Sequence, residues 1–186
     1  MQPTSPYGEH KARAHEYLRN IRSEYSLPIG IGILYNHESP LRPPRFVSRR
    51  VTAGVAAISE GLLDKLTLGN LSVRRDWGFA GDHCVAISQI GLQRHDEDFV
   101  IATGVQRRVS DLVATAFGAA GVRNWQKYVE SEEALLRPVD PGNLFGDPTK
   151  VRTYLGWKPN RSFDDMISEM VAHDLERLRN GEPALP

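Results

Sequence analysis

The feature that most constrains the fold is the apolar run at positions 29–35, Ile-Gly-Ile-Gly-Ile-Leu-Tyr. The run is too short for a buried helix, and its β-branched isoleucines favour an extended chain. An apolar run without polar alternation is typical of a strand that lies inside a parallel sheet and is covered on both faces. We therefore predict a parallel strand here. The polar, proline-rich segment 36–45 is predicted to be a loop at the carboxyl end of this strand, where open α/β sheets place ligands.

Helical signals alternate with short apolar segments along the rest of the chain. Ser5 and Pro6 predict a helix start, because a hydroxyl N-cap precedes a proline at the first helical position, and Pro28 is expected to end this helix. Further helices are predicted over 46–61, 80–93 and 110–118, and from Asp147 and Ser162 onward. Further strands are predicted over 66–68 and 99–103, while 125–143 is expected to be irregular. This alternation predicts the α/β class.

Composition excludes several functional classes. Lys+Arg and Asp+Glu number 23 each, so no overall basic charge favours nucleic acid or an anionic membrane as a partner. No apolar run is long enough to span a bilayer, and the N-terminus carries no signal-peptide pattern. Cys84 is the one cysteine, which rules out an internal disulfide and favours a cytoplasmic location. Because it lies in an apolar segment, Cys84 is predicted to be a buried, unreactive thiol.

Tyr7 and Lys11 are candidates for chemistry. They are four residues apart, so both side chains share one face of the first predicted helix. The ammonium of Lys11 can then stabilise the phenolate of Tyr7, which accepts a hydroxyl proton while hydride leaves the same carbon. The spacing alone is weak evidence, because an interfacial tyrosine beside a solvated lysine gives the same pattern.

The motifs that follow favour the catalytic interpretation. They include Asn-His-Glu-Ser-Pro at 36–40, Arg-Asp-Trp-Gly at 75–78, Gly-Asp-Pro-Thr-Lys at 146–150 and Leu-Gly-Trp-Lys-Pro at 155–159. From residue 5 to about residue 179 this series resembles the GDP-mannose 4,6-dehydratases, a family of extended short-chain dehydrogenases/reductases. The first two motifs are specific within that superfamily, whereas Tyr-x-x-x-Lys marks only the superfamily.

The resemblance implies a role for several residues. Tyr7 would accept the proton of the sugar 4-hydroxyl, and Lys11 would activate it and hold the nicotinamide ribose. NADP is the implied cofactor, GDP-mannose is the implied substrate, and no metal ion is expected. The further implied contacts are His37 and Arg42 for NADP, and Asn36, Val47, Arg50, Arg75 and Arg137 for the GDP-sugar. We expect Arg75 to follow a strand-turn and precede a helix, Arg49 and Arg74 to be surface residues, and Trp77 to be a core residue.

The sequence departs from the family pattern at the substrate end. Leu41 replaces the first of two arginines, Arg50 replaces a lysine, and prolines at 43 and 44 stiffen the same segment. His83 breaks the usual run after Trp-Gly, and Leu136 replaces a tyrosine before the implied substrate contact. The glycine-rich phosphate turn and the Thr and Glu of the elimination step precede the tyrosine in the family, and they have no counterpart here.

The predicted fold is therefore α/β, with an incomplete NAD(P)-binding Rossmann-like parallel sheet and a mixed α/β substrate-binding lobe. Residues 1–45 would belong to the Rossmann-like domain, and 46–186 mainly to the sugar-nucleotide-binding lobe. The leading hypothesis is an NADP-dependent GDP-mannose 4,6-dehydratase-like protein that forms GDP-4-keto-6-deoxymannose, truncated and with little activity alone. Two alternatives remain open: a non-catalytic GDP-sugar-binding module, or another nucleotide-sugar reductase or epimerase. A homo-oligomer is expected for the full-length family, and a separately encoded Rossmann half is a further possible partner.

Overall fold

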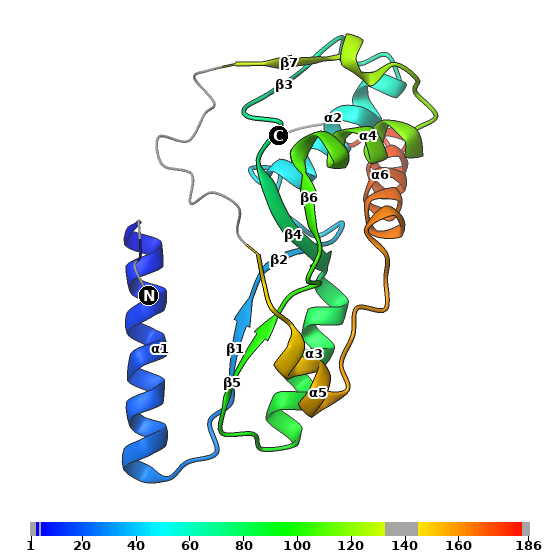
Figure 1. Ribbon diagram of the computed structural model, residues 1–186. Helices are drawn as coiled ribbons and strands as arrows, with labels where there is room; N and C mark the ends of the chain where they lie inside the picture. Colours follow the sequence, from blue (N-terminus) through cyan, green and yellow to red (C-terminus); the bar gives the residue numbers. More distant parts are fainter. Residues whose placement is uncertain (1–2, 4, 133–144, 184–186) are drawn as a thin grey trace.

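The computed structural model describes residue 3, residues 5–132 and residues 145–183. Three parts follow one another in space: α1, the β1–β5 pair with α3 and α5, and a lobe of α2, α4 and α6 (Figure 1). The elements in chain order are α1 (Pro6–Tyr25), β1 (Ile31–Leu34), β2 (Asn36–Glu38), α2 (Val47–Ser59), β3 (Leu66–Leu68), β4 (Arg74–Phe79), α3 (Ala80–Leu92), β5 (Asp98–Ile101), β6 (Gln106–Arg108), α4 (Val109–Ala119), η1 (Trp125–Lys127), β7 (Val129–Ser131), α5 (Thr149–Leu155) and α6 (Phe163–Arg179). The predicted α/β class is confirmed.

Helix α1 begins where the cap signal predicts. The hydroxyl oxygen of Ser5 accepts a hydrogen bond from the backbone N–H of Gly8, which satisfies one donor of the first turn. The helix ends at Tyr25, earlier than the predicted stop at Pro28, because Ser26 turns into the left-handed conformation. None of the residues of α1, all of which the structure describes, is buried. The helix lies beside the β1–β5 pair rather than inside the core (Figure 1).

The apolar run predicted as a parallel strand forms β1, which pairs in parallel with β5 from Ile31 opposite Asp98 to Leu34 opposite Ile101. Burial on both faces, however, was wrong. Ile31 is buried, but Leu34 is 38% exposed. The covering helix is α3, which approaches so closely that a Cβ on Gly32 would lie 2.4 Å from the Cδ1 of Ile87. Nothing comparable covers the opposite face among the described residues, because α1 has no buried side chain.

The segment predicted as a loop over 36–45 begins instead with strand β2. Asn36 pairs with Trp77 and Glu38 with Phe79 in a parallel ladder between β2 and β4, and β6 joins the other edge of β4 in antiparallel fashion. This pairing places the Asn-His-Glu-Ser-Pro and Arg-Asp-Trp-Gly motifs side by side. Arg75 therefore lies within β4, not between a turn and a helix as predicted.

The main core lies among α2, α4, α6 and strand β3. Its fully buried side chains include Val51, Val55, Leu66, Leu112, Phe117, Met166, Ile167 and Met170. A smaller cluster around Phe99 and Ile101 joins β5 to α3 and α5. Helix α6 follows the predicted start at Ser162 and buries Met166, Ile167, Met170 and Val171 on its inward face. The predicted core position of Trp77 is confirmed, since Trp77 is 3% exposed.

Two predictions of burial were wrong in opposite directions. Cys84 is exposed, because α3 buries His83, Ala86 and Ile90 on its other side. Arg49 is buried at 3% exposure, because it points between α2 and α6 and meets Asp174. Arg74 is half-buried.

Segment 125–143, expected to be irregular, contains η1 and the short strand β7, which pairs in parallel with β3. Its residues 133–143 lie outside the described part. Within the part of the chain that is described, no helix has the length and apolar character needed to cross a membrane.

Candidate functional site

A cleft of about 950 Å³ opens at the carboxyl end of β1, bounded by β2, β4 and the start of α2. Its lining contains seven of the nine residues predicted from the sequence: Tyr7, Asn36, His37, Arg42, Val47, Arg50 and Arg75. They come from α1, β2, the β2–α2 connection, α2 and β4, so the fold gathers positions that are far apart in the chain. Lys11 is not part of the lining. Arg137 lies outside the described residues.

Tyr7 and Lys11 share a face of the first two turns of α1, as the four-residue spacing predicts. The Nζ of Lys11 lies 5.5 Å from the centre of the Tyr7 ring. This is a cation–π distance, in which the ammonium can stabilise negative charge on the phenol without a direct hydrogen bond. Tyr7 is 72% exposed, so its ring stands at the mouth of the cleft rather than in the floor.

His37 is held by the strand that carries it. Its Nδ1 lies 2.9 Å from the carbonyl oxygen of Tyr35, which can only accept, so Nδ1 carries the proton. The ring lies 5.4 Å from that of His83, which is buried at 2% exposure. Burial lowers the pKa of His83, and its Nδ1 lies 3.0 Å from the carbonyl oxygen of Phe79. His83 is therefore a neutral ring packed behind His37.

Glu38 is a buried carboxylate at the base of the cleft that sequence reasoning did not single out. Its Oε2 accepts a hydrogen bond from the Ser48 hydroxyl and lies 3.1 Å from the Nε of Arg42. Burial raises the pKa of Glu38, while the Ser48 hydrogen bond and the charges of Arg42 and His37 act in the opposite direction. The available signal was an acidic residue inside a specific motif, with an arginine four residues later.

The charge of the cleft is strongly positive. Arg42, Arg45, Arg50 and Arg75 all line it, whereas Glu38 is the one acidic side chain among the described lining residues. The Nη1 of Arg75 donates to the carbonyl oxygen of Arg74 at 2.7 Å. Several guanidinium groups around one hollow favour a ligand with more than one negative charge, such as a diphosphate. The apolar part of the wall comes from Leu34, Phe46, Val47, Leu68, Val73, Trp77 and Val109.

Asp76 fixes the far wall of the cleft, between Arg75 and Trp77. Its Oδ1 accepts hydrogen bonds from the backbone N–H and the hydroxyl of Thr103, and its Oδ2 accepts one from the N–H of Gly104. The carboxylate is 1% exposed. It therefore ties β4 to the turn after β5, which keeps the arginine-bearing strand in place.

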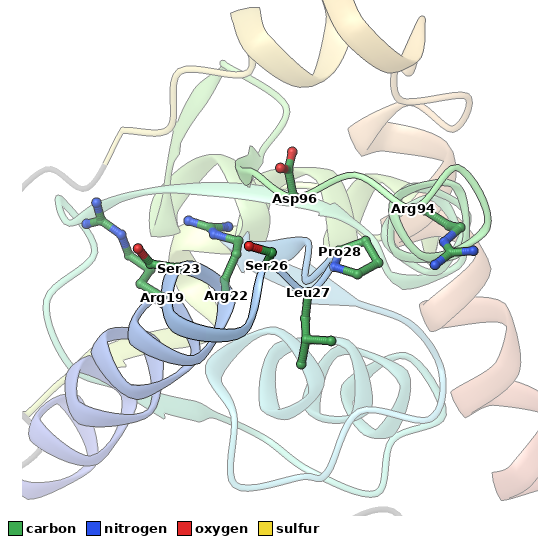
Figure 2. Close-up of a pocket in the computed structure, with 8 residues that line it drawn as sticks. All are labelled: Arg19, Arg22, Ser23, Ser26, Leu27, Pro28, Arg94 and Asp96. Atoms are coloured by element: carbon green, nitrogen blue, oxygen red, sulfur yellow. The ribbon is translucent and has the colours of Figure 1, made fainter.

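A second hollow of about 600 Å³ lies at the opposite end of the β1–β5 pair. Figure 2 shows its residues: Arg19, Arg22 and Ser23 from the end of α1, Ser26, Leu27 and Pro28 from the connection, and Arg94 and Asp96 from the turn before β5. Arg22 is already occupied, since its Nη1 lies 2.9 Å from Asp98 and donates to the carbonyl oxygen of Ile29. None of the eight predicted site residues that the structure describes lies there.

Comparisons with known proteins agree with the sequence motifs. The model of a family described as GDP-mannose 4,6 dehydratase matches residues 1–170. GDP-mannose 4,6 dehydratase 2 of Arabidopsis thaliana is 43% identical over 176 residues, covering 95% of this chain and 47% of that protein. GDP-mannose 4,6 dehydratase of Homo sapiens is 37% identical over 198 residues, covering 98% and 53%. The chain thus spans about half the length of the curated relatives it matches.

Solved structures show the same fold. RMD from Pseudomonas aeruginosa, complexed with NADPH, matches with a TM-score of 0.84 at 17% identity, over 95% of this chain and 57% of that one. DesIV, a dTDP-glucose 4,6-dehydratase from Streptomyces venezuelae with NAD and TYD bound, matches with a TM-score of 0.83 at 24% identity, over 100% and 55%. The likeness confirms the predicted Rossmann-like α/β fold, of which this chain carries about half.

Proposed function

The chain belongs to the GDP-mannose 4,6-dehydratase family, and on that premise we propose that its cleft is the sugar-nucleotide side of the dehydratase active site. The observation that carries the proposal is the convergence of Tyr7 and the cleft arginines on one hollow. The substrate would be GDP-mannose and the product GDP-4-keto-6-deoxymannose. The relatives do not favour the alternatives of a reductase, an epimerase or a binding module.

In this proposal the arginines receive the diphosphate of the substrate. Arg50 and Arg75 are half-buried on adjacent walls, α2 and β4, so their guanidinium groups approach the hollow from two directions. Charge-assisted contacts of this kind are stronger than neutral hydrogen bonds, and they fix the orientation of the bound diphosphate. Asn36 and Val47 line the same hollow and would contact the remainder of the GDP-sugar, with Arg137 as a further proposed contact.

A nicotinamide dinucleotide is the proposed cofactor, in its NADP form. The chain's residues fit one side of it: His37 and Arg42 line the cleft, and Lys11 lies one helical turn from Tyr7. No hydrogen-bond or ion-pair partner of the terminal Arg42 nitrogens is found among the described residues, so they can meet a phosphate. When bound, the dinucleotide supplies the hydride acceptor. Comparing NADPH with NADH in binding experiments tests the preference for the phosphorylated form.

Tyr7 is the proposed proton acceptor. Its phenolate oxygen would take the proton of the sugar 4-hydroxyl as hydride leaves the same carbon, and the nearby Lys11 ammonium would stabilise the phenolate. The exposure of Tyr7 at the cleft mouth, at 72%, means that little of this site is shielded from water in this chain. Because proton and hydride transfer gain from a dry, closed site, we expect low turnover from this chain alone.

Binding and turnover are tested separately. Calorimetric titration with GDP-mannose should detect binding that Arg50→Ala weakens by about ten-fold or more, as expected for loss of a charged hydrogen-bond donor. Arg13→Ala is the matched control, because Arg13 is an exposed residue of α1 outside the cleft. Equal affinity in the wild type and in Arg50→Ala would contradict the proposed diphosphate site.

For catalysis, the variant is Tyr7→Phe, which removes the hydroxyl and keeps the ring. Any conversion of GDP-mannose with added NADP should fall by at least about a hundred-fold, while GDP-mannose affinity stays within about two-fold. Tyr17→Phe is the control, since Tyr17 is exposed on the same helix and does not line the cleft. Binding without turnover in the wild type would leave the sugar-nucleotide site standing and reject catalysis by this chain alone.

Three further proposals accompany this function. The boundary at residue 45 divides a Rossmann-like part from the sugar-nucleotide lobe, which limited proteolysis can test. The protein is proposed to form a homo-oligomer, which sedimentation can test, and to reside in the cytoplasm.

A further inference from the structure

We infer that Glu38 is a positioning residue for the cleft: its buried carboxylate holds Arg42 in place and anchors it to the first turn of α2. This inference rests on the proposed function, since it assigns Arg42 its place at the anionic ligand. The carboxylate acts through Arg42 and Ser48, the two side chains that its Oε2 contacts among the described residues.

The geometry around Arg42 shows how it is held. Its Nε is buried and lies 3.1 Å from the Oε2 of Glu38, at ion-pair distance but without the alignment of a hydrogen bond. Its guanidinium carbon lies 3.6 Å from the centre of the Phe46 ring. A carboxylate beside Nε and an aromatic face under the guanidinium plane restrict the rotamers of a long side chain. The terminal nitrogens are left for a ligand in the cleft.

Glu38 also fixes Arg42 relative to the neighbouring elements. The same Oε2 atom accepts the hydroxyl hydrogen bond of Ser48, which is fully buried in the first turn of α2. Glu38 itself is the last residue of β2, and Asn36 and His37 precede it on that strand. One carboxylate therefore connects the strand that bears His37, the segment that bears Arg42 and the helix that bears Arg50.

A second buried contact keeps this segment in place. Arg49 donates from Nε to the carbonyl oxygen of Pro40 at 3.1 Å, while its Nη1 binds Asp174 of α6. The backbone of the connection is thus held from the core side, and Glu38 determines where the side chain of Arg42 lies. Removing the charge of Glu38 should release that side chain without unfolding the segment.

The first test follows Arg42 itself, with no ligand present. The Arg42 Nε–H signal in a nitrogen–proton correlation spectrum is assigned with Arg42→Lys. In the wild type it should be displaced by the Phe46 ring and should exchange slowly with water. In Glu38→Gln, which can still accept the Ser48 hydrogen bond, it should move to the position of exposed arginines such as Arg13. Glu60→Gln is the control, because it breaks the 3.1 Å ion pair between Glu60 and the exposed Arg179.

An Arg42 signal that is unchanged in Glu38→Gln overturns the inference. If Glu38→Gln does not fold, Phe46→Leu takes its place by removing the aromatic face and keeping the carboxylate. Continued slow exchange of the Arg42 Nε–H in Phe46→Leu supports holding by Glu38. Exchange as fast as that of Arg13 shows that stacking alone held the side chain, and this result also overturns the inference.

The second test measures coupling in ligand binding, with NADP and GDP as separate probes. Glu38→Gln should weaken the probe that contacts Arg42 by about five-fold, and should have no further effect in an Arg42→Ala background. Additive losses, or tighter binding in Glu38→Gln, would mean that the carboxylate acts only through its charge, against the inference. If neither probe binds the wild type, the proposed function fails, and the Arg42 spectrum still decides the positioning role.

Discussion

Arg49 and Asp174, 125 residues apart in the sequence, form an ion pair in which both side chains are 3% exposed. The pair joins α2 to α6 inside the main core, and Arg49 also donates to the carbonyl oxygen of Pro40, two residues before Arg42 of the candidate site. A contact that stabilises the lobe therefore also shapes the segment that carries Arg42. The Arg49–Asp174 pair therefore links the stability of the lobe to the geometry of the candidate site.

Loss of Asp174 should be strongly destabilising. Asp174→Ala leaves the Arg49 charge buried without its partner, and we expect the free energy of unfolding to fall by about 3–5 kcal/mol. Urea denaturation followed by circular dichroism measures this change. Glu176→Ala, at an exposed position of the same helix, should change it by less than about 0.5 kcal/mol. A loss below about 1 kcal/mol for Asp174→Ala would contradict the structural importance of the pair.

Glu38 should make stability depend on pH in a characteristic direction. Burial raises its pKa above the ordinary value of 4.5, so the folded state keeps the proton to higher pH than the unfolded state. Stability is then lost as pH rises through the raised pKa. Glu38→Gln does not titrate, and it should be at least as stable as the wild type near neutral pH, with this advantage disappearing in acid. Denaturation from about pH 4 to pH 8 tests the sign, and the reverse trend would refute it.

Asp98 should make stability depend on pH in the direction opposite to Glu38. Burial by itself would raise its pKa, but hydrogen bonds from His15 and Arg22, together with their charges, lower it below the ordinary 3.8. The contribution of Asp98 to the free energy of unfolding is therefore fully present above its pKa in the unfolded chain. It is lost as pH falls through the lowered pKa of Asp98 in the folded protein. Asp98→Asn should lose about 1 kcal/mol near neutral pH and show no deficit in strong acid.

The matched control for this prediction is Asp96→Asn, at an exposed neighbouring position. Since Asp98 binds His15 and Arg22 of α1, amide hydrogen exchange in α1 should also become faster in Asp98→Asn. A constant deficit at every pH would show that the carboxylate charge is not the cause.

Gly146 should not tolerate a side chain. An added Cβ would lie 2.3 Å from the Cβ of Ala102 and 3.0 Å from the ring of Tyr35, so the backbone must shift. Gly146→Ala should lower the free energy of unfolding by about 1–3 kcal/mol. Gly118→Ala is the control in α4, where nothing lies within 4 Å of the new atom. It should raise stability by about 0.5–1 kcal/mol, and equal effects of the two substitutions would argue against the close approach at Gly146.

Local features of the sequence determined the elements that depend on few neighbours. The Ser5 cap starts α1, the apolar run forms β1, and Ser162 caps the start of α6, each as predicted. Short specific motifs also indicated the family, and they pointed to seven of the residues that line the cleft. These features can be predicted from the sequence because capping, strand propensity and amphipathic periodicity depend on only a few neighbouring residues.

Tertiary structure alone decided which of these residues are buried and which meet. Cys84 was predicted to be buried and is exposed, whereas Arg49 was predicted to be exposed and is buried. Burial depends on which helix or strand packs against a residue, and residue type alone does not determine it. The parallel pairing of β2 with β4 brought the Asn-His-Glu-Ser-Pro and Arg-Asp-Trp-Gly motifs together. In this arrangement the carboxylate of Glu38 contacts both Arg42 and Ser48. Tyr7 and Lys11 were visible in the sequence as a helical pair. The position of Tyr7 at the mouth of an arginine-lined cleft depends on α1 lying beside β1, a long-range arrangement that no local pattern specifies.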